Sequence, residues 1–148
     1  MTRLPLAALA TAAVLAGLSA CATVAGAVGK SWSTALVGNQ EVPGPGDPDG
    51  TGTAKVTADA TTDTVCVDIG VRAISRPTAA HIHRGRRGEA GPPVLTLPAP
   101  VNGAAKQCLR VEKALAAAII ADPAGYYVNI HTADYPAGAI RGQLAAGR

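Results

Sequence analysis

Aromatic residues are scarce in this sequence, which contains no Phe, one Trp and three Tyr among 148 residues. Proteins that bind single-stranded nucleic acids stack the bases on aromatic side chains, and such platforms are missing here. The 13 basic and 10 acidic residues give a formal net charge of +3. That charge is too small for the basic surface that nucleic-acid binding requires. We therefore expect no nucleic-acid partner.

Catalytic motifs are absent as well. The sequence has no Gly-x-Ser-x-Gly elbow of the kind that exposes a nucleophilic serine. It also has no pair of carboxylates in a context that would raise the pKa of one of them, as acid–base catalysis by two carboxyl groups requires. We therefore predict that the protein is not an enzyme.

Long hydrophobic runs are missing too, because the apolar run LPLAALATAAVLAG is too short to span a bilayer comfortably. Preceded by Arg3, this run is typical of an export signal. The following Leu18-Ser19-Ala20-Cys21 resembles a bacterial lipobox, whose cysteine is lipidated and becomes the new N-terminus. We predict a lipoprotein signal peptide over residues 1–20, a lipid on Cys21 and a tether over residues 21–30. The alternative is an ordinary signal peptide, or a short anchor, with an incidental cysteine.

Cysteine is rare, with three residues in the chain. If Cys21 carries the lipid, Cys66 and Cys108 remain, each within an alternating apolar stretch. The compartment outside the membrane permits oxidation, so we predict a disulfide between them. The alternative is two buried thiols. No CxxC spacing occurs, which gives a thioredoxin-type redox role no support.

The rest of the chain has the apolar period of two that is typical of strands. Residues 112–121 break this period with helix formers and predict one short helix. Short strands with Gly and Pro between them indicate one all-β domain over residues 31–148, built as an antiparallel sandwich or flattened barrel. The expected strands are residues 31–37, 53–60, 64–71, 78–83, 92–97, 106–112, 126–132 and 139–145.

The three histidines are candidate metal ligands. His81 and His83 share one face of an expected strand, with Cα atoms roughly 6.5–7 Å apart. If residues 126–132 form the neighbouring strand, His131 joins them. Three histidines with an open fourth position suit zinc or copper. The alternative is structural, because a neutral histidine has one donor and one acceptor with which to tie the following loop to the sheet.

Arginines follow the first two histidines, and the densest positive cluster comprises Arg84, Arg86 and Arg87. Their guanidinium groups could bind an anionic partner, such as lipid headgroups or a cell-wall polymer. The alternative is a solvated loop tip. Arg141 lies in an expected strand, and we predict a structural role for it, partly buried against a carboxylate such as Glu41 or Asp134.

Several spaced motifs in this sequence resemble the CHRD domain, a family named for its occurrence in chordin. They are Asn39-Gln40-Glu41-Val42-Pro43, Ala80-His81-Ile82-His83-x-Gly85 with Gly91-Pro92, Tyr127-Val128-Asn129-Ile130-His131-Thr132, and Pro136-x-Gly138-x-Ile140-Arg141-Gly142-Gln143-Leu144. The resemblance covers essentially all of residues 31–148 and implies an immunoglobulin-like β-sandwich of the Greek-key type. It marks as family residues Glu41, Pro43, Asn129, Arg141, Gly142 and Gln143.

These patterns together predict a non-catalytic binding or interaction module, lipid-anchored to the extracytoplasmic face of the membrane in a bacterial cell envelope. Its partners are the membrane, through the lipid, and an envelope or extracellular molecule that the sequence does not identify. We expect no cofactor on this hypothesis. The alternative hypothesis is an envelope metal-binding protein that holds copper or zinc with His81, His83 and His131.

Overall fold

The computed structural model of the protein describes residues 29–145. The predicted signal peptide, the lipidation site Cys21 and the tether up to residue 28 lie outside the described residues. The domain predicted from residue 31 begins close to the first strand, which starts at Lys30.

Within the described residues, eight strands form where the apolar period of two predicts them, and one α-helix forms where helix formers interrupt that period. The helix α1 covers Lys113–Ala121, and two short 3-10 turns, η1 and η2, cover Gly38–Gln40 and Pro123–Gly125. The strands are β1 Lys30–Val37, β2 Thr51–Asp59, β3 Thr64–Arg72, β4 Pro77–Arg84, β5 Pro93–Leu97, β6 Ala104–Arg110, β7 Tyr126–Thr132 and β8 Ile140–Gln143.

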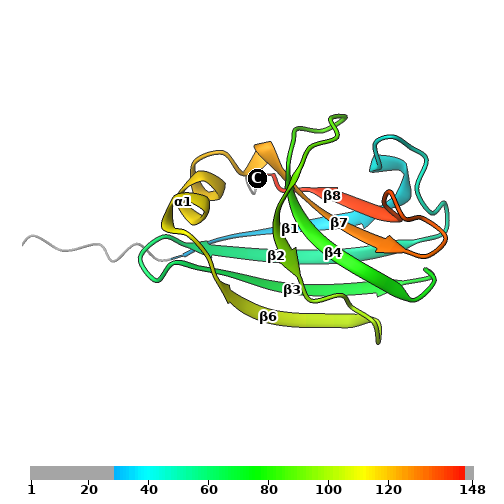
Figure 1. The fold of residues 1–148 in the computed structure, drawn as a ribbon, viewed down its shortest axis with the longest axis horizontal. Coiled ribbons are helices and arrows are strands. Elements are labelled where there is room, and N and C mark those ends of the chain that lie inside the picture. Colours follow the sequence, from blue (N-terminus) through cyan, green and yellow to red (C-terminus); the bar gives the residue numbers. More distant parts are fainter. Residues whose placement is uncertain (1–28, 146–148) are drawn as a thin grey trace, which may run out of the picture.

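Within residues 29–145 the strands form one antiparallel eight-stranded sheet in the order β5-β4-β7-β8-β1-β2-β3-β6. The sheet curls into a half-barrel, so that β4 passes in front of β2 and β3 in Figure 1. We call β1, β2, β3 and β6 the disulfide half and β5, β4, β7 and β8 the histidine half. The all-β antiparallel class is confirmed. An immunoglobulin-like Greek-key sandwich is not, because β8 pairs with both β7 and β1 and so joins the halves in one sheet.

The apolar core fills the inside of this curl. Every second residue of β3 from Val65 to Val71 is buried, and so are Ala80 and Ile82 on β4. Residues from both halves belong to one buried cluster, which Ile119 of α1 joins at the end of the sheet. No helix among the described residues is long and apolar enough to cross a membrane.

The predicted disulfide is present between Cys66 and Cys108, 42 positions apart in the sequence. The two residues lie directly opposite each other on β3 and β6. Strand β6 is at the edge of the sheet and is mostly exposed, so the bond fixes a strand that buries little apolar surface. On the chain-entropy model a loop of this length is worth about 4 kcal/mol. A disulfide also fits an oxidising, extracytoplasmic compartment.

Candidate functional site

The outer face of the histidine half carries polar side chains in register across three strands. Because neighbours along a strand point to opposite sides, burying Ile82 and Val128 in the core turns the residues beside them outward. One row across β4, β7 and β8 is His83, Tyr127 and Gln143, and the next is His81, Asn129 and Arg141. We call these side chains, together with His131, the polar face. The pairing of β4 with β7, on which convergence of the histidines depends, is therefore confirmed.

Arg141 is the largest of the fully buried side chains in the described chain, at 1% exposure. Its guanidinium donates to the carbonyl oxygens of Glu89 and Arg86, both at 2.8 Å, and to Gln143 Oε1 at 3.2 Å. It also lies 3.4 Å above the ring of Tyr127. Burial lowers the pKa of Arg141, whereas Tyr127 and the other acidic groups around it oppose this shift.

No ion pair joins Arg141 to a carboxylate among the side chains that the structure describes. Asp134 instead accepts a hydrogen bond from Ser75. Glu41 attracts Arg141 through its charge but is hydrogen bonded to Asn129. The guanidinium is instead held by two backbone carbonyls, which are acceptors that carry no charge.

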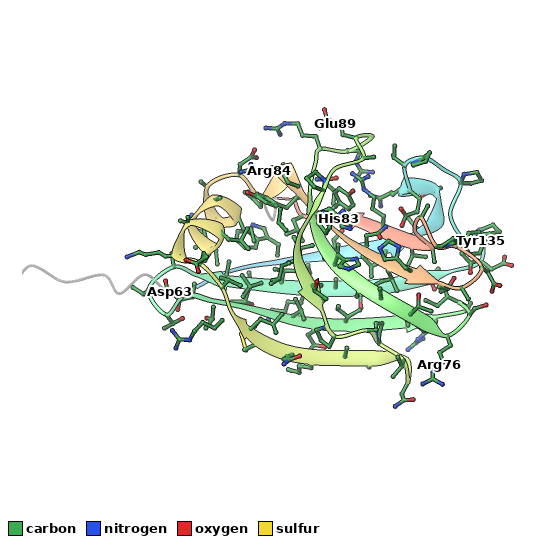
Figure 2. All side chains as sticks on the ribbon, viewed as in Figure 1. Asp63, Arg76, His83, Arg84, Glu89 and Tyr135 are labelled. Carbon is green, nitrogen blue, oxygen red and sulfur yellow. A yellow bond between two sulfur atoms is a disulfide. The ribbon has the colours of Figure 1, made fainter. Side chains whose placement is uncertain are left out.

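The two backbone acceptors of Arg141 belong to residues 85–92, which we call the arginine loop. Gln143 Nε2 lies 2.8 Å from the carbonyl oxygen of Gly85. His83 Nδ1 donates to the carbonyl oxygen of Gly91 at 2.8 Å, and the Tyr127 hydroxyl accepts from Gly91 N at 3.2 Å. The polar face therefore holds the backbone of the loop at both ends and, through Arg141, in its middle. Figure 2 shows His83 at the base of this loop and Glu89 near its tip.

Glu41 covers the polar face from the loop between β1 and β2. Its carboxylate accepts two hydrogen bonds from Asn129 Nδ2, at 2.6 and 2.8 Å, and its side chain is 7% exposed. Burial raises the pKa of Glu41 to about 7, although Arg141 and the Asn129 hydrogen bond act in the opposite direction. Gly138 has a φ of +153°, and a Cβ there would lie 2.3 Å from Glu41 Oε2. Only glycine fits beside this carboxylate.

Two other family residues shape the edges of the site. Pro43 lies in the exposed turn that follows Glu41, after a cis peptide bond. Gly142 lies in β8, where a Cβ would come 2.4 Å from the carbonyl oxygen of Ala35. A side chain at position 142 would therefore push β8 away from β1, the strand pair that joins the two halves of the sheet.

The three histidines converge on the polar face. His81, His83 and His131 each place one ring nitrogen within 4.8 Å of the others. Two nitrogens bound to one tetrahedral zinc ion are roughly 3.3 Å apart, so the widest pair of nitrogens would have to close by up to about 1.5 Å. Burial is the main reason that the pKa values of His81 and His83 are lowered.

The predicted structural role of the histidines is met by His83 and His131. His83 bonds the arginine loop at Gly91, as the loop-tying interpretation expects, and His131 Nδ1 donates to the carbonyl oxygen of Pro136 at 3.0 Å. These bonds use only one nitrogen of each ring. The metal-ligand interpretation therefore stays open beside the structural one.

An open cavity of about 420 Å³ lies between the arginine loop and α1. Arg86 Nη2 forms an ion pair with Asp122 at 2.9 Å across it, and Arg84 Nη2 donates to the Tyr126 hydroxyl at 3.4 Å. Sequence reasoning missed both Asp122 and Tyr126, which lie more than thirty positions from these arginines and carry no motif. The cavity is lined by Arg84, Gly85, Arg86, Glu89, Ala118, Ala121, Asp122, Gly125 and Tyr126.

A family model of the CHRD domain matches residues 32–144. The chain therefore belongs to the CHRD domain family, and the match covers every strand of the described sheet except the first two residues of β1. No curated protein and no solved structure matches the chain. What the domain does must therefore be argued from its own geometry.

Proposed function

We propose that the protein is a non-catalytic, lipid-anchored binding module on the extracytoplasmic face of a bacterial envelope membrane, and that the arginine loop is its binding surface. The observation that carries this proposal is that the buried Arg141 and Gln143 and the half-buried His83 hold the loop by its backbone. A loop that is already ordered loses less conformational entropy when it binds a partner. The buried groups thus favour binding without touching the partner themselves.

The exposed side chains of this region favour an anionic partner. Arg84, Arg86 and Arg87 are all exposed, and the cavity beside them offers polar groups and a tyrosine ring. Guanidinium groups form charge-assisted hydrogen bonds with phosphate and carboxylate oxygens. Asp122 neutralises part of the charge of Arg86 in the free protein. An anionic component of the envelope, such as a lipid headgroup or a cell-wall polymer, would replace that carboxylate.

The proposal is non-catalytic because the polar groups of the site are already engaged. Arg141 and Gln143 bind backbone carbonyls, and Glu41 accepts from Asn129. Within the described residues, none of these three groups lines the open cavity beside the loop. They support the shape of the surface and are not placed to act on a bound molecule.

The test separates the lipid anchor from the loop. A Cys21→Ser variant should be released from membranes, because the proposed lipid is then lost, and this soluble form can be sedimented with isolated envelope fragments. We expect it to bind, and we expect Arg86→Gln/Arg87→Gln in the same background to reduce the bound fraction at least about tenfold, since each guanidinium contact to an anion is charge-assisted.

The matched control is Arg72→Gln/Arg76→Gln, which removes the same charge from exposed positions at the end of β3 and in the turn after it. Figure 2 shows Arg76 far from Arg84 and Glu89. The control should bind like the parent. Equal losses in the two variants would point to net charge alone and would contradict a binding surface at the loop.

A further inference from the structure

The geometry of the three histidine rings suits a metal ion. His81 Nδ1 and His131 Nε2 lie 3.1 Å apart. Two nitrogens bound at about 2.0–2.1 Å to a tetrahedral ion are roughly 3.3 Å apart. The ring centroid of His83 lies 5.5 Å from the ring centroid of His81 and 6.2 Å from the ring centroid of His131. The rings come from two adjacent strands, so the sheet fixes their backbone positions.

The hydrogen bonds of two rings leave their other nitrogens ready to coordinate. A carbonyl oxygen can only accept, so Nδ1 of His83 and Nδ1 of His131 both carry the proton. In a neutral ring the lone pair is then on Nε2. Metal-binding histidines usually have this arrangement, with the far N–H bonded to a carbonyl or carboxylate.

A second observation points to a missing ligand at this place. His83 Nε2 is buried and, among the described residues, has no hydrogen-bond partner. Buried polar atoms without a partner are rare in folded proteins, and an ion or an ordered water is a usual explanation. The rings of His81 and His131 lie beside it, because one nitrogen of each of the three rings is within 4.8 Å of the others.

We propose that His81 Nδ1, His83 Nε2 and His131 Nε2 form a site for one ion of the zinc–copper class, with a fourth coordination position open. Neutral imidazole nitrogens suit zinc and copper, whereas calcium and magnesium require oxygen ligands. His81 Nδ1 donates to His131 Nε2 in the free protein, because His131 Nε2 is the acceptor. Metal binding therefore moves the proton of His81 from Nδ1 to Nε2, which leaves the ring neutral.

The ion would also act on the arginine loop, because His83 contacts the carbonyl of Gly91 in that loop through Nδ1. Coordination at Nε2 fixes both rings and strengthens their N–H donors to Gly91 and Pro136. Because this orders the loop at Gly91, we expect slower hydrogen exchange at the Gly91 amide, which donates to the Tyr127 hydroxyl, in the metal-bound protein. This effect depends on the metal site alone and does not require that the loop binds an envelope partner.

The experiment uses the full chain, purified in detergent and freed of metal with a chelator, and titrated with Zn²⁺ or Cu²⁺ against a chromophoric competitor. The informative variant is His83→Asn. The asparagine amide can still donate to the Gly91 carbonyl, but it has no counterpart of Nε2. We expect one ion per parent chain, with copper bound more tightly than zinc. The variant should weaken binding by more than about 100-fold, since removing even an outer partner of a ligating histidine weakens it about 10–100-fold.

Two further variants keep the test decisive. Thr78→Asn changes an exposed residue of the same strand and should bind metal like the parent. His81→Gln removes a ligand whose ring forms no hydrogen bond to the backbone in the described structure. It therefore tests the site even if His83→Asn fails to fold. Parent-like affinity in His83→Asn or His81→Gln, or no binding by the parent chain, would overturn the metal site. Loss of binding in both histidine variants, with Thr78→Asn unchanged, would support it.

Discussion

The outer faces of the two halves of the sheet differ in how far they are buried. In β3 of the disulfide half, buried and accessible residues alternate, so the outer face is in contact with solvent. In β7 of the histidine half every residue except His131 is buried, and in β8 every residue is. The chain thus has two interiors: an apolar one inside the curl, and a polar one between the sheet and the two loops that cover it.

This difference in burial predicts how well each half tolerates substitutions. Burial of apolar groups is not directional, so the inner core tolerates changes that keep volume and pattern. Buried polar groups, in contrast, need partners with the right geometry, and one lost partner leaves others unsatisfied. We therefore expect that replacing a single hydrogen-bonding residue of the histidine half lowers the stability of the protein markedly. The disulfide half should depend on its covalent bond.

The largest effect is expected from removing that covalent bond. A Cys66→Ala/Cys108→Ala variant should lose about 4 kcal/mol of unfolding free energy, because the open loop gains entropy when the chain unfolds. Urea denaturation of the parent and the variant measures this loss. Hydrogen exchange at Gly85 and Gly91 should be unchanged under native conditions, since these residues are held by the other half. Faster exchange there would show that the halves are not independent.

A smaller but still large effect is expected from Arg141→Met. Methionine retains much of the length and apolar contact of arginine but cannot donate, so the carbonyls of Arg86 and Glu89 lose their buried partner. We expect a loss of about 3 kcal/mol in urea denaturation, because each lost hydrogen bond from a charged donor is worth about 1.5–3 kcal/mol.

The control for Arg141→Met is Lys55→Met, which makes a similar change at an exposed position on the outer face of β2. Its stability should change by no more than about 0.5 kcal/mol, as is usual for surface substitutions. Similar losses in the two variants would contradict the contrast between the halves.

Much of the fold could be predicted because one face of each strand is apolar. The period of two in residues 64–71 and 126–132 predicts strands and also which residues face the core. The disulfide followed from the number of cysteines, and the helix from a run of helix formers. The order of the strands could not be predicted, because periodicity describes the faces of a strand and not its neighbours. The pairing of β8 with β1, which turns the expected sandwich into one curled sheet, has no signal in the pattern.

In the candidate site, only contacts between side chains could be predicted from the sequence. The convergence of the histidines followed from strand parity and one assumed pairing, that of β4 with β7. The partners of Arg141 and Gln143 could not be found in this way, because they are backbone carbonyls, which every residue has. The contact of Glu41 with Asn129 joins positions 88 apart, and neither residue type requires the other.

The smallest of the three effects is a dependence on pH that comes from the polar interior. Burial raises the pKa of Glu41 to about 7, so the folded protein favours the protonated carboxyl more than the unfolded chain does. A raised carboxyl pKa means that stability is greatest at low pH and falls as pH rises through the folded-state pKa. Between about pH 5.5 and 8 this group should remove about 2 kcal/mol of unfolding free energy.

A Glu41→Gln variant should lack this decline, because glutamine does not titrate and keeps an oxygen that can accept from Asn129. The half-buried His81 and His83 have lowered pKa values and act in the opposite direction as pH rises, but they are present in both proteins and cancel from the difference. Asp68→Asn is the control in the disulfide half, since this carboxylate is exposed and paired with Lys106 at the surface. If Glu41→Gln and the parent lose stability equally between these pH values, ionising the Glu41 carboxyl does not lower the unfolding free energy. That result would mean that water reaches the polar interior, and it would contradict the burial of this carboxyl.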